Sequence, residues 1–236
     1  MKMKNISENK SDFVKSVFNK VFNKYDIMND LLSFGSHRIW KKQMIQWLSP
    51  KKKSILMDMA CGTGDITELF LKYLNNECKI YASDPNKQML NAAKKRLKKY
   101  KNIKWYLNKA EKLEFENNFF DYYTISFGIR NVTNINQTLR EAHRVLKPGG
   151  RFLCLEFSKI QNNNLEKLYN LYSKAIPKIG NVIIGDSAPY EYLVNSIENF
   201  HNQNELLELM KKNNFYKCEY RNLSGGIVAI HSGWKI

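Results

Sequence analysis

A glycine-rich turn flanked by acidic side chains separates a short apolar run from a helix-forming segment. The run is Ser-Ile-Leu-Met-Asp-Met at 54–59, and the turn at 60–65 is Ala-Cys-Gly-Thr-Gly-Asp. A short apolar run followed by a glycine turn and a helix is typical of the opening of a doubly wound α/β domain, whose ligands lie at the carboxyl ends of the strands. Gly62 and Gly64 lack Cβ, so the backbone can approach a ligand closely there.

The details of this turn limit the ligand that it can hold. A dinucleotide fingerprint needs a third glycine where Thr67 stands, and no Gly-Lys-Ser/Thr sequence is present for a phosphate-binding loop. Asp58 and Asp65 disfavour a pyrophosphate and favour a cation. Asp84 ends the next apolar run about 20 residues after the turn, where ribose hydroxyls are usually bound. A ribose-bearing cation without a pyrophosphate describes S-adenosylmethionine; alternatively, Asp58 and Asp84 only cap helices.

Polar residues also follow the later predicted strands. The strand at 102–107 leads into Lys109-Ala110-Glu111, a turn that would lie beside an adenine in a nucleotide-binding domain. The strand at 119–128 leads into Arg130 and Asn131, at the carboxyl end of a central strand, where ligands bind. The alternative for Arg130 is a structural ion pair with a local carboxylate.

The order of the predicted elements indicates the fold class. Strands and helices alternate up to a fifth strand at 151–157, and a helix at 203–213 precedes an antiparallel hairpin. This order matches a class I S-adenosylmethionine-dependent methyltransferase, with a doubly wound seven-stranded sheet whose last strand is reversed. Residues 50–236 would form this Rossmann-like domain, with an insertion at about 160–195 that begins as a helix at 165–176 and continues as a loop-rich stretch.

The N-terminal 49 residues do not fit the alternating pattern. Residues 1–10 are polar and are expected to be a disordered tail, and 11–49 are expected to form a helical lid that ends before Ser49-Pro50. The stretch 24–40 mixes aromatic and charged residues; it is either a helical hairpin packed on the core or a lid that shapes an acceptor pocket. The candidate substrate residues in it are Tyr25, Asp26, His37 and Trp40.

Composition sets broad limits on function. The 236 residues carry a formal charge of +16, but only seven of the 38 basic residues are arginine and the lysines are scattered. This scatter is less typical of a nucleic-acid site than of a general basic surface, which could be attracted to an anionic membrane. The four cysteines show neither Cys-x-x-Cys nor metal-ligand spacing, so no metal is expected. Without a signal sequence or a long apolar run, we expect a cytoplasmic protein, with peripheral contact to the inner membrane left open.

Most of the chain from residue 18 onward resembles the ubiquinone/menaquinone biosynthesis C-methyltransferases of the UbiE type. The matching segments are VFNKYDIMND at 21–30, SHRIW at 36–40, DMACGTGD at 58–65, ISFGIRNV at 125–132, RVLKPGG at 144–150, LEFS at 155–158 and NLSGGIVAIH at 222–231. The glycine turn and Lys-Pro-Gly-Gly occur in many methyltransferases, whereas the Tyr-Asp-x-Met-Asn and Ser-Phe-Gly-Ile-Arg-Asn segments are specific.

The resemblance implies S-adenosylmethionine binding through the positions that match Thr63, Asp84, Lys109-Ala110 and Ser126. It implies C-methylation of 2-methoxy-6-polyprenyl-1,4-benzoquinol, of a demethylmenaquinol, or of both. It also implies transient membrane contact, and it leaves open a homodimer and contacts with other quinone-biosynthesis enzymes. Lys109 departs from the family, which usually has Asn or Asp there, and Ala60 replaces the first glycine of the general methyltransferase turn.

The chemistry that this implies needs a quinol phenolate to attack the methyl group. We expect Arg130 to stabilise the phenolate and Asn131 to orient the ring or a water, with His37 or Asp26 as candidate proton acceptors. Two other functions compete with this interpretation. A nucleic-acid methyltransferase is suggested by the charge but lacks the Asn/Asp-Pro-Pro-Tyr motif of base amino-methylating enzymes, and a non-catalytic scaffold conflicts with an intact glycine turn.

Overall fold

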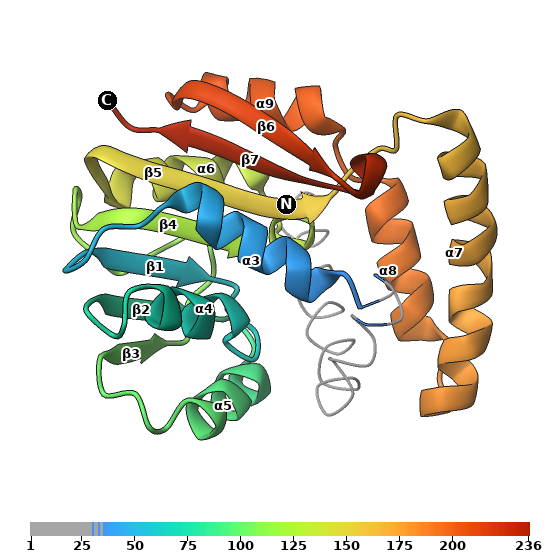
Figure 1. Ribbon diagram of the computed structural model, residues 1–236, viewed down its shortest axis with the longest axis horizontal. Helices are drawn as coiled ribbons and strands as arrows, with labels where there is room; N and C mark the ends of the chain where they lie inside the picture. Colours follow the sequence, from blue (N-terminus) through green and yellow to red (C-terminus); the bar gives the residue numbers. More distant parts are fainter. Residues whose placement is uncertain (1–29, 31–32, 34) are drawn as a thin grey trace, which may run out of the picture.

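The computed structural model describes residues 30, 33 and 35–236, which form a seven-stranded sheet with helices on both faces (Figure 1). The strands are β1 (Ile55–Met59), β2 (Lys79–Ser83), β3 (Ile103–Tyr106), β4 (Phe120–Ser126), β5 (Leu146–Phe157), β6 (Tyr216–Leu223) and β7 (Val228–Trp234). Their order is β3-β2-β1-β4-β5-β7-β6. The first five strands pair in parallel, and β7 is antiparallel to both β5 and β6, which confirms the predicted reversed last strand.

Two apolar clusters, one on each face of the sheet, form the core. Neighbouring strand residues such as Leu56 and Met57 are both buried and belong to opposite clusters, as expected for strands covered on both faces. The helices α3 (His37–Leu48), α4 (Asp65–Tyr73) and α5 (Lys87–Arg96) contribute to one cluster, and α6 (Ile135–Val145) and α9 (Gln203–Lys212) contribute to the other.

Asparagine begins four of the helices. The side chains of Asn86, Asn134, Asn162 and Asn202 accept hydrogen bonds from first-turn backbone N–H groups of α5, α6, α7 and α9. Such caps satisfy donors that have no partner inside the helix. At α9, the side chain of Glu205 also accepts a hydrogen bond from the Asn202 backbone, which completes a capping box.

The helix α3 is fixed to the sheet at its C-terminal end. The Trp47 ring contacts two guanidinium groups, with its centroid 5.2 Å from Arg151 Cζ and 4.2 Å from Arg221 Cζ. Arg151 also donates a 2.6 Å hydrogen bond to the Trp47 carbonyl and lies 4.8 Å from the Trp234 ring. Cation–π contacts of this kind between partly buried groups are attractive. The helix ends at Leu48, as predicted.

The predicted loop-rich stretch after residue 176 is wrong. Instead, α7 (Asn163–Ile184) continues through Pro177 and ends at Gly185, whose φ is +80°, and α8 (Ala188–Glu198) follows after two more residues. Proline has a φ that suits a helix and removes one backbone donor, so a long helix with enough packing can contain it. Together α7 and α8 lie beyond the carboxyl ends of the strands, at the right of Figure 1.

The fifth strand also begins earlier than predicted. Lys147-Pro-Gly-Gly does follow the end of α6, but it belongs to β5 and not to a separate turn, because Leu146 already pairs with Phe120. The pairing shifts register between Phe120 and Tyr122, which accommodates Pro148 and the two glycines. The predicted tail and the first part of the lid lie outside the described residues.

Candidate active site

The glycine turn joins the carboxyl end of β1 to α4 in a strained backbone conformation. Ala60, Gly62 and Gly64 all have positive φ, at 53°, 54° and 88°. A Cβ at Gly64 would lie 2.8 Å from Leu97 Cδ1, so the close contact of this turn with α5 requires glycine. Ala60 has a left-handed backbone conformation that a glycine would adopt more easily.

A small pocket lies above this turn, between α3 and the ends of β1 and β4. Its lining residues are Lys41, Asp58, Ala60, Cys61, Gly62, Thr63, Asp65, Ile66, Ser126 and Phe127. The structure thus brings together the predicted residues Asp58, Gly62, Thr63 and Ser126. Ser126 Oγ is buried and has no hydrogen-bond partner within the described part of the chain, so it is available to a ligand.

Asp58 and Asp84 anchor the turn from two neighbouring strands. Asp58 accepts hydrogen bonds from the hydroxyls of Thr67 and Thr124, at 2.6 and 3.2 Å, and from the Thr67 backbone. Asp84 accepts 2.8 Å bonds from the backbone N–H groups of Gly62 and Asn86. Burial raises the pKa of each carboxyl to about 6.

The helix-cap alternative describes part of this geometry. The Thr67 amide lies in the first turn of α4, so Asp58 does cap that helix, whereas α5 is capped by the Asn86 side chain and not by Asp84. Asp84 instead ties the turn to the end of β2. Both of its oxygens keep a further lone pair, which leaves acceptor capacity for ribose hydroxyls.

The two residues predicted to lie near an adenine have different environments. The Lys109 side chain is exposed, and the residue forms an isolated bridge with Lys112, whereas Ala110 is buried. Asn108, which sequence analysis did not single out, has a buried Nδ2 without a partner among the described residues. Asn108 directly precedes Lys109 in the sequence. This adjacency to a predicted adenine-binding position was the signal that could have identified it.

Arg130 is held in a buried ion pair just after β4. It lies in the short 3₁₀ helix η2 (Ile129–Asn131), and its Nη1 donates 2.8 Å hydrogen bonds to Glu156 Oε1 and to the Phe127 carbonyl. Burial raises the pKa of Glu156, and the guanidinium opposes that shift. The alternative expectation, an arginine tied to a local carboxylate, is therefore present in the structure; a catalytic role for Arg130 stays a prediction.

Arg130 also reaches the helices at the carboxyl edge of the sheet. Its Nε donates to Ser196 Oγ of α8 at 3.3 Å, and the next residue, Asn131, accepts a 2.9 Å hydrogen bond from the Tyr192 hydroxyl. A second cavity of about 250 Å³ lies between α7, α8 and the segment after β5. It is lined by Ser158, Lys159, Ile160, Glu166, Tyr169, Ser173, Ile176, Val194, Ile197 and Glu198.

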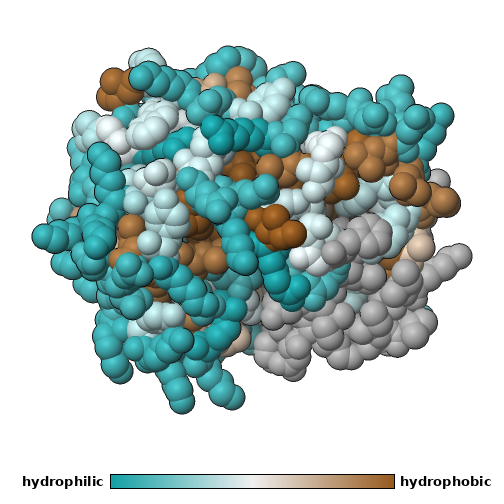
Figure 2. Space-filling view, in the orientation of Figure 1, coloured by the Kyte–Doolittle hydropathy of each residue, from teal (hydrophilic) through white to brown (hydrophobic). Residues whose placement is uncertain are grey.

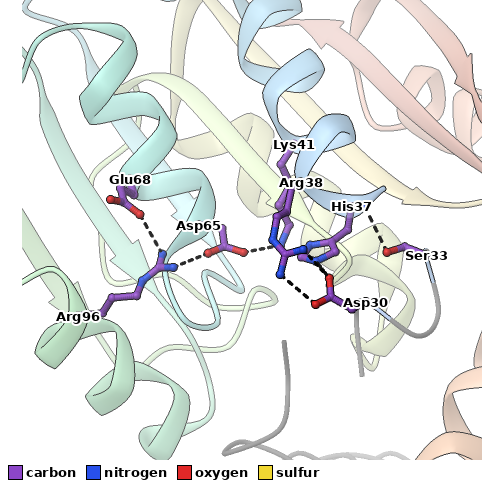
Figure 3. A network of polar contacts seen from close by, with 8 residues as sticks. All are labelled: Asp30, Ser33, His37, Arg38, Lys41, Asp65, Glu68 and Arg96. Carbon is purple, nitrogen blue, oxygen red and sulfur yellow. Dashed lines mark hydrogen bonds and ion pairs between the residues drawn. The ribbon is translucent and has the colours of Figure 1, made fainter. Parts of the chain in front are cut away.

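The candidate substrate residues of the N-terminal segment are only partly described. Tyr25 and Asp26 lie outside the described residues. His37 is buried, with Nε2 2.9 Å from Asp30 Oδ1, and burial lowers its pKa (Figure 3). Trp40 packs against Phe127 and Phe157 and donates a 2.9 Å hydrogen bond to Ser224 Oγ, so it belongs to the core beside the first pocket and lines neither cavity.

A chain of charged groups joins α3 to the glycine turn and to α5. Lys41 Nζ and Arg96 Nη1 each lie 2.7 Å from a different oxygen of Asp65, and Arg96 Nη2 is 3.7 Å from Glu68 (Figure 3). Burial alone would raise the pKa of Asp65, but the two cations lower it to about 2. Sequence analysis noted Asp65 beside the turn but missed Lys41, which comes from outside the strand–turn–helix unit.

Comparisons with known proteins identify the family of the chain. The model of the ubiE/COQ5 methyltransferase family matches residues 3–235. The chain belongs to the ubiE/COQ5 methyltransferase family. A curated relative from Rickettsia bellii, named ubiquinone/menaquinone biosynthesis C-methyltransferase UbiE, is 47% identical over 234 residues, which cover 96% of this chain and 94% of the relative.

Solved structures of other methyltransferases share the fold at low sequence identity. An S-adenosylmethionine-dependent methyltransferase from Thermotoga maritima has a TM-score of 0.65 at 21% identity, covering 94% of this chain and 99% of that one. A phosphoethanolamine N-methyltransferase from Haemonchus contortus, solved with S-adenosylhomocysteine, has a TM-score of 0.62 at 16% identity, covering 83% of this chain and 52% of that one. The ubiE/COQ5 enzyme described here thus has the class I fold, and its cofactor is S-adenosylmethionine.

The residues of the first pocket fit this cofactor. S-adenosylmethionine carries a sulfonium, an ammonium and a carboxylate, and the pocket lining provides two carboxylates and one ammonium. The unpartnered Ser126 hydroxyl adds a neutral donor and acceptor at the same place. When bound, the cofactor supplies an electrophilic methyl group on its sulfonium.

Proposed function

We propose that this methyltransferase methylates a ring carbon of a polyprenyl quinol, either 2-methoxy-6-polyprenyl-1,4-benzoquinol or a demethylmenaquinol. The names of its relatives support this substrate class, and family membership does not favour a nucleic-acid substrate. The position of Arg130 is the observation that carries the proposal. This buried cation is linked to the cofactor pocket through the Phe127 carbonyl and to α8, a wall of the second cavity, through Ser196.

The reaction needs a ring carbon that is made nucleophilic by an adjacent phenolate. The carbon takes the methyl group as the carbon–sulfur bond breaks, and the ring then loses a proton to recover aromaticity. Arg130 stays protonated, so its role is to stabilise the phenolate charge and not to accept a proton. Its Nη1 and Nε are engaged, whereas the two N–H groups of Nη2 have no partner among the described residues, and we assign these to the phenolate oxygen.

Proton removal falls to groups near the first part of α3 and η2. Asn131, held by the Tyr192 hydroxyl, orients the ring or a water that carries the proton away. His37 is the candidate final acceptor: burial lowers the pKa of its imidazole, and Asp30 orients the ring through Nε2. Asp26, the other candidate, lies outside the described residues.

The second cavity provides apolar walls for the substrate. Ile176, Val194 and Ile197 line it together with Tyr169, and polar groups of Ser158 and Ser173 lie among them. We place the quinol ring or the first unit of its tail here. A longer isoprenoid tail has to continue into another apolar environment, since about 250 Å³ holds only part of it.

Transient contact with a membrane surface belongs to the same proposal. No helix in the described ranges is long and apolar enough to cross a membrane. The helix α7, however, exposes Leu168 at 66% and Leu171 at 70%. Figure 2 shows brown, apolar surface at the upper right, on the side of the molecule where Figure 1 places α7. The two leucines lie on the helix that walls the second cavity, so they fit a contact through which a lipid-dissolved tail enters. Homodimer formation and contacts with other quinone-biosynthesis enzymes stay predictions.

Methyl transfer from labelled S-adenosylmethionine to two reduced acceptors tests the function. One acceptor is a methoxy-polyprenyl-benzoquinol and the other a demethylmenaquinol, both presented in detergent or liposomes. Label in either product supports the proposal and identifies the ring that the enzyme accepts. Binding of S-adenosylhomocysteine without label in either acceptor would contradict it and favour the scaffold alternative.

A matched pair of variants tests the role of Arg130. Arg130→Met leaves Glu156 buried without its cationic partner and is expected to cost about 3–5 kcal/mol of stability. Arg130→Met/Glu156→Gln removes both charges but keeps an acceptor for the Phe157 amide, so it is expected to recover most of this loss. We expect turnover to stay at least about 100-fold reduced in the double variant, as after loss of a transition-state donor. Recovery of turnover together with the melting temperature would reduce Arg130 to a structural role.

A further inference from the structure

The charges of the cofactor pocket mirror those of an amino-acid moiety attached to a sulfonium. Among the lining residues that the structure describes, Asp58 and Asp65 are the acidic ones and Lys41 is the basic one. The cofactor has the opposite set, two positive groups and one carboxylate. Arg96, the other cation near the turn, contacts Asp65 but does not line the pocket.

Lys41 is held where such a carboxylate would lie. Its side chain is only 7% exposed, and its Nζ lies 2.7 Å from Asp65 Oδ2 and 5.9 Å from the centre of the Phe127 ring. Asp65 and Phe127 line the same pocket as Lys41. A buried ammonium has three donors to satisfy, and Lys41 donates one of them to Asp65 Oδ2.

Asp65 does not depend on Lys41 alone. Its second oxygen binds Arg96, so the carboxylate keeps a cationic partner when Lys41 turns toward a ligand. Lys41 can therefore share its ammonium between Asp65 and a further anion without leaving a buried charge unpaired, which would be strongly destabilising.

We propose that Lys41 of α3 binds the carboxylate of the methionine moiety of the cofactor, while Asp58 and Asp65 face its positive groups. The N-terminal helix then contributes directly to the cofactor site, which the strand–turn–helix unit alone does not complete. This assignment concerns cofactor binding and holds whichever quinol is the acceptor.

Calorimetric titration with two ligands tests the assignment. One is S-adenosylhomocysteine, and the other is its decarboxylated analogue, which keeps the adenosine, the sulfur and the amine. A charged hydrogen bond in a buried site corresponds to roughly 10- to 100-fold in affinity. We expect Lys41→Met to weaken S-adenosylhomocysteine by this factor and to change the affinity of the analogue by less than about threefold. Lys41→Arg should retain most of the discrimination between the two ligands.

Lys42→Met is the matched control, because Lys42 is the exposed neighbour of Lys41 on the same helix. It is expected to bind both ligands as the unmodified protein does. An equal loss for both ligands in Lys41→Met would overturn the assignment and leave Lys41 as a structural partner of Asp65.

The unmodified protein provides a test that needs no substitution. It is expected to bind S-adenosylhomocysteine at least about tenfold more tightly than the decarboxylated analogue. Equal affinities would overturn the proposal even if Lys41→Met failed to fold.

Discussion

Asp84 shows how one buried carboxylate can both shape a turn and serve a ligand. It fixes the glycine turn through the Gly62 amide and the end of β2 through the Asn86 amide. Burial raises its pKa to about 6, so the group is ionised at neutral pH but loses its charge within an accessible range. Its acceptor capacity for ribose hydroxyls depends on that charge.

Cofactor affinity is therefore expected to fall as the pH decreases through about 6. Below the pKa, each pH unit lowers the ionised fraction about tenfold, so we expect the Kd of S-adenosylhomocysteine to be roughly tenfold higher at about pH 5 than at about pH 7.5. Asp84→Asn should bind weakly at both values and lose most of this dependence. A full pH dependence in Asp84→Asn would assign the titration to Asp58, whose pKa burial also raises to about 6.

Several pocket residues could be predicted from the sequence for a simple reason. Asp58 and Ser126 lie at the carboxyl ends of the parallel strands β1 and β4, and Thr63 lies in the turn after β1. The carboxyl ends of parallel strands meet at one edge of the sheet. Lys41 could not be found in this way, because its approach to Asp65 depends on how α3 packs across the sheet. The ion pair of Arg130 with Glu156 could not be predicted either, because Glu156 lies on another strand, β5.

At the scale of elements, β1 and β4 approach most closely just beyond their carboxyl ends. A Cβ at Gly128 would lie 2.5 Å from the Ala60 Cβ and 3.2 Å from Ile125 Cγ1. Ala60 and Phe127 have positive φ, at 53° and 55°, which is uncommon for residues with side chains. The methyl group of Ala60 therefore leaves no space for a side chain at position 128, and the glycine there leaves space for Ala60.

We expect Gly128→Ala to destabilise the fold by about 1–3 kcal/mol, because two backbones must move apart. Ala60→Gly removes the opposing methyl group and the strain at residue 60, so Ala60→Gly/Gly128→Ala should recover most of the loss. Denaturant unfolding of the single and double variants measures this coupling. Additive free energies would show that the two residues do not compete for the same space.

Element boundaries were predicted well where the turn-forming residues in the sequence do end a helix or strand in the structure. The hairpin of β6 and β7 and the end of α3 before Ser49-Pro50 are of this kind. The end of α7 was not, because Pro177 and Gly180 suggest a break whereas the chain places its left-handed residue at Gly185. Packing of α7 on α8 outweighs the local preference, and sequence patterns do not report that packing.

At the scale of the whole molecule, the net positive charge and the exposed leucines both favour binding to an anionic membrane surface. A formal charge of +16 attracts the protein to anionic surfaces over about a Debye length, and apolar side chains can then enter the interface. Leu168 and Leu171 are exposed on α7, on the helix that lines the second cavity. Leu107, at 54% exposure, lies just after the edge strand β3 and not on α7.

Sedimentation with vesicles should separate these contributions. Binding to vesicles with anionic lipid is expected to exceed binding to neutral vesicles and to decrease as salt rises from about 0.05 to about 0.5 M. Leu168→Asp/Leu171→Asp should reduce binding several-fold, whereas Leu107→Asp, an exposed leucine outside α7 replaced in the same way, should have a smaller effect. Equal effects of the two replacements would contradict a specific role for α7.

Two tryptophans fix α3 along its length. Trp47 contacts two guanidinium groups, and Trp40 packs on Phe127 and donates a hydrogen bond to Ser224. Because Lys41 directly follows Trp40, its 2.7 Å contact with Asp65 lies on a fixed part of the helix. The helix thus gives the cofactor pocket a preorganised wall, and little binding free energy is lost to ordering it.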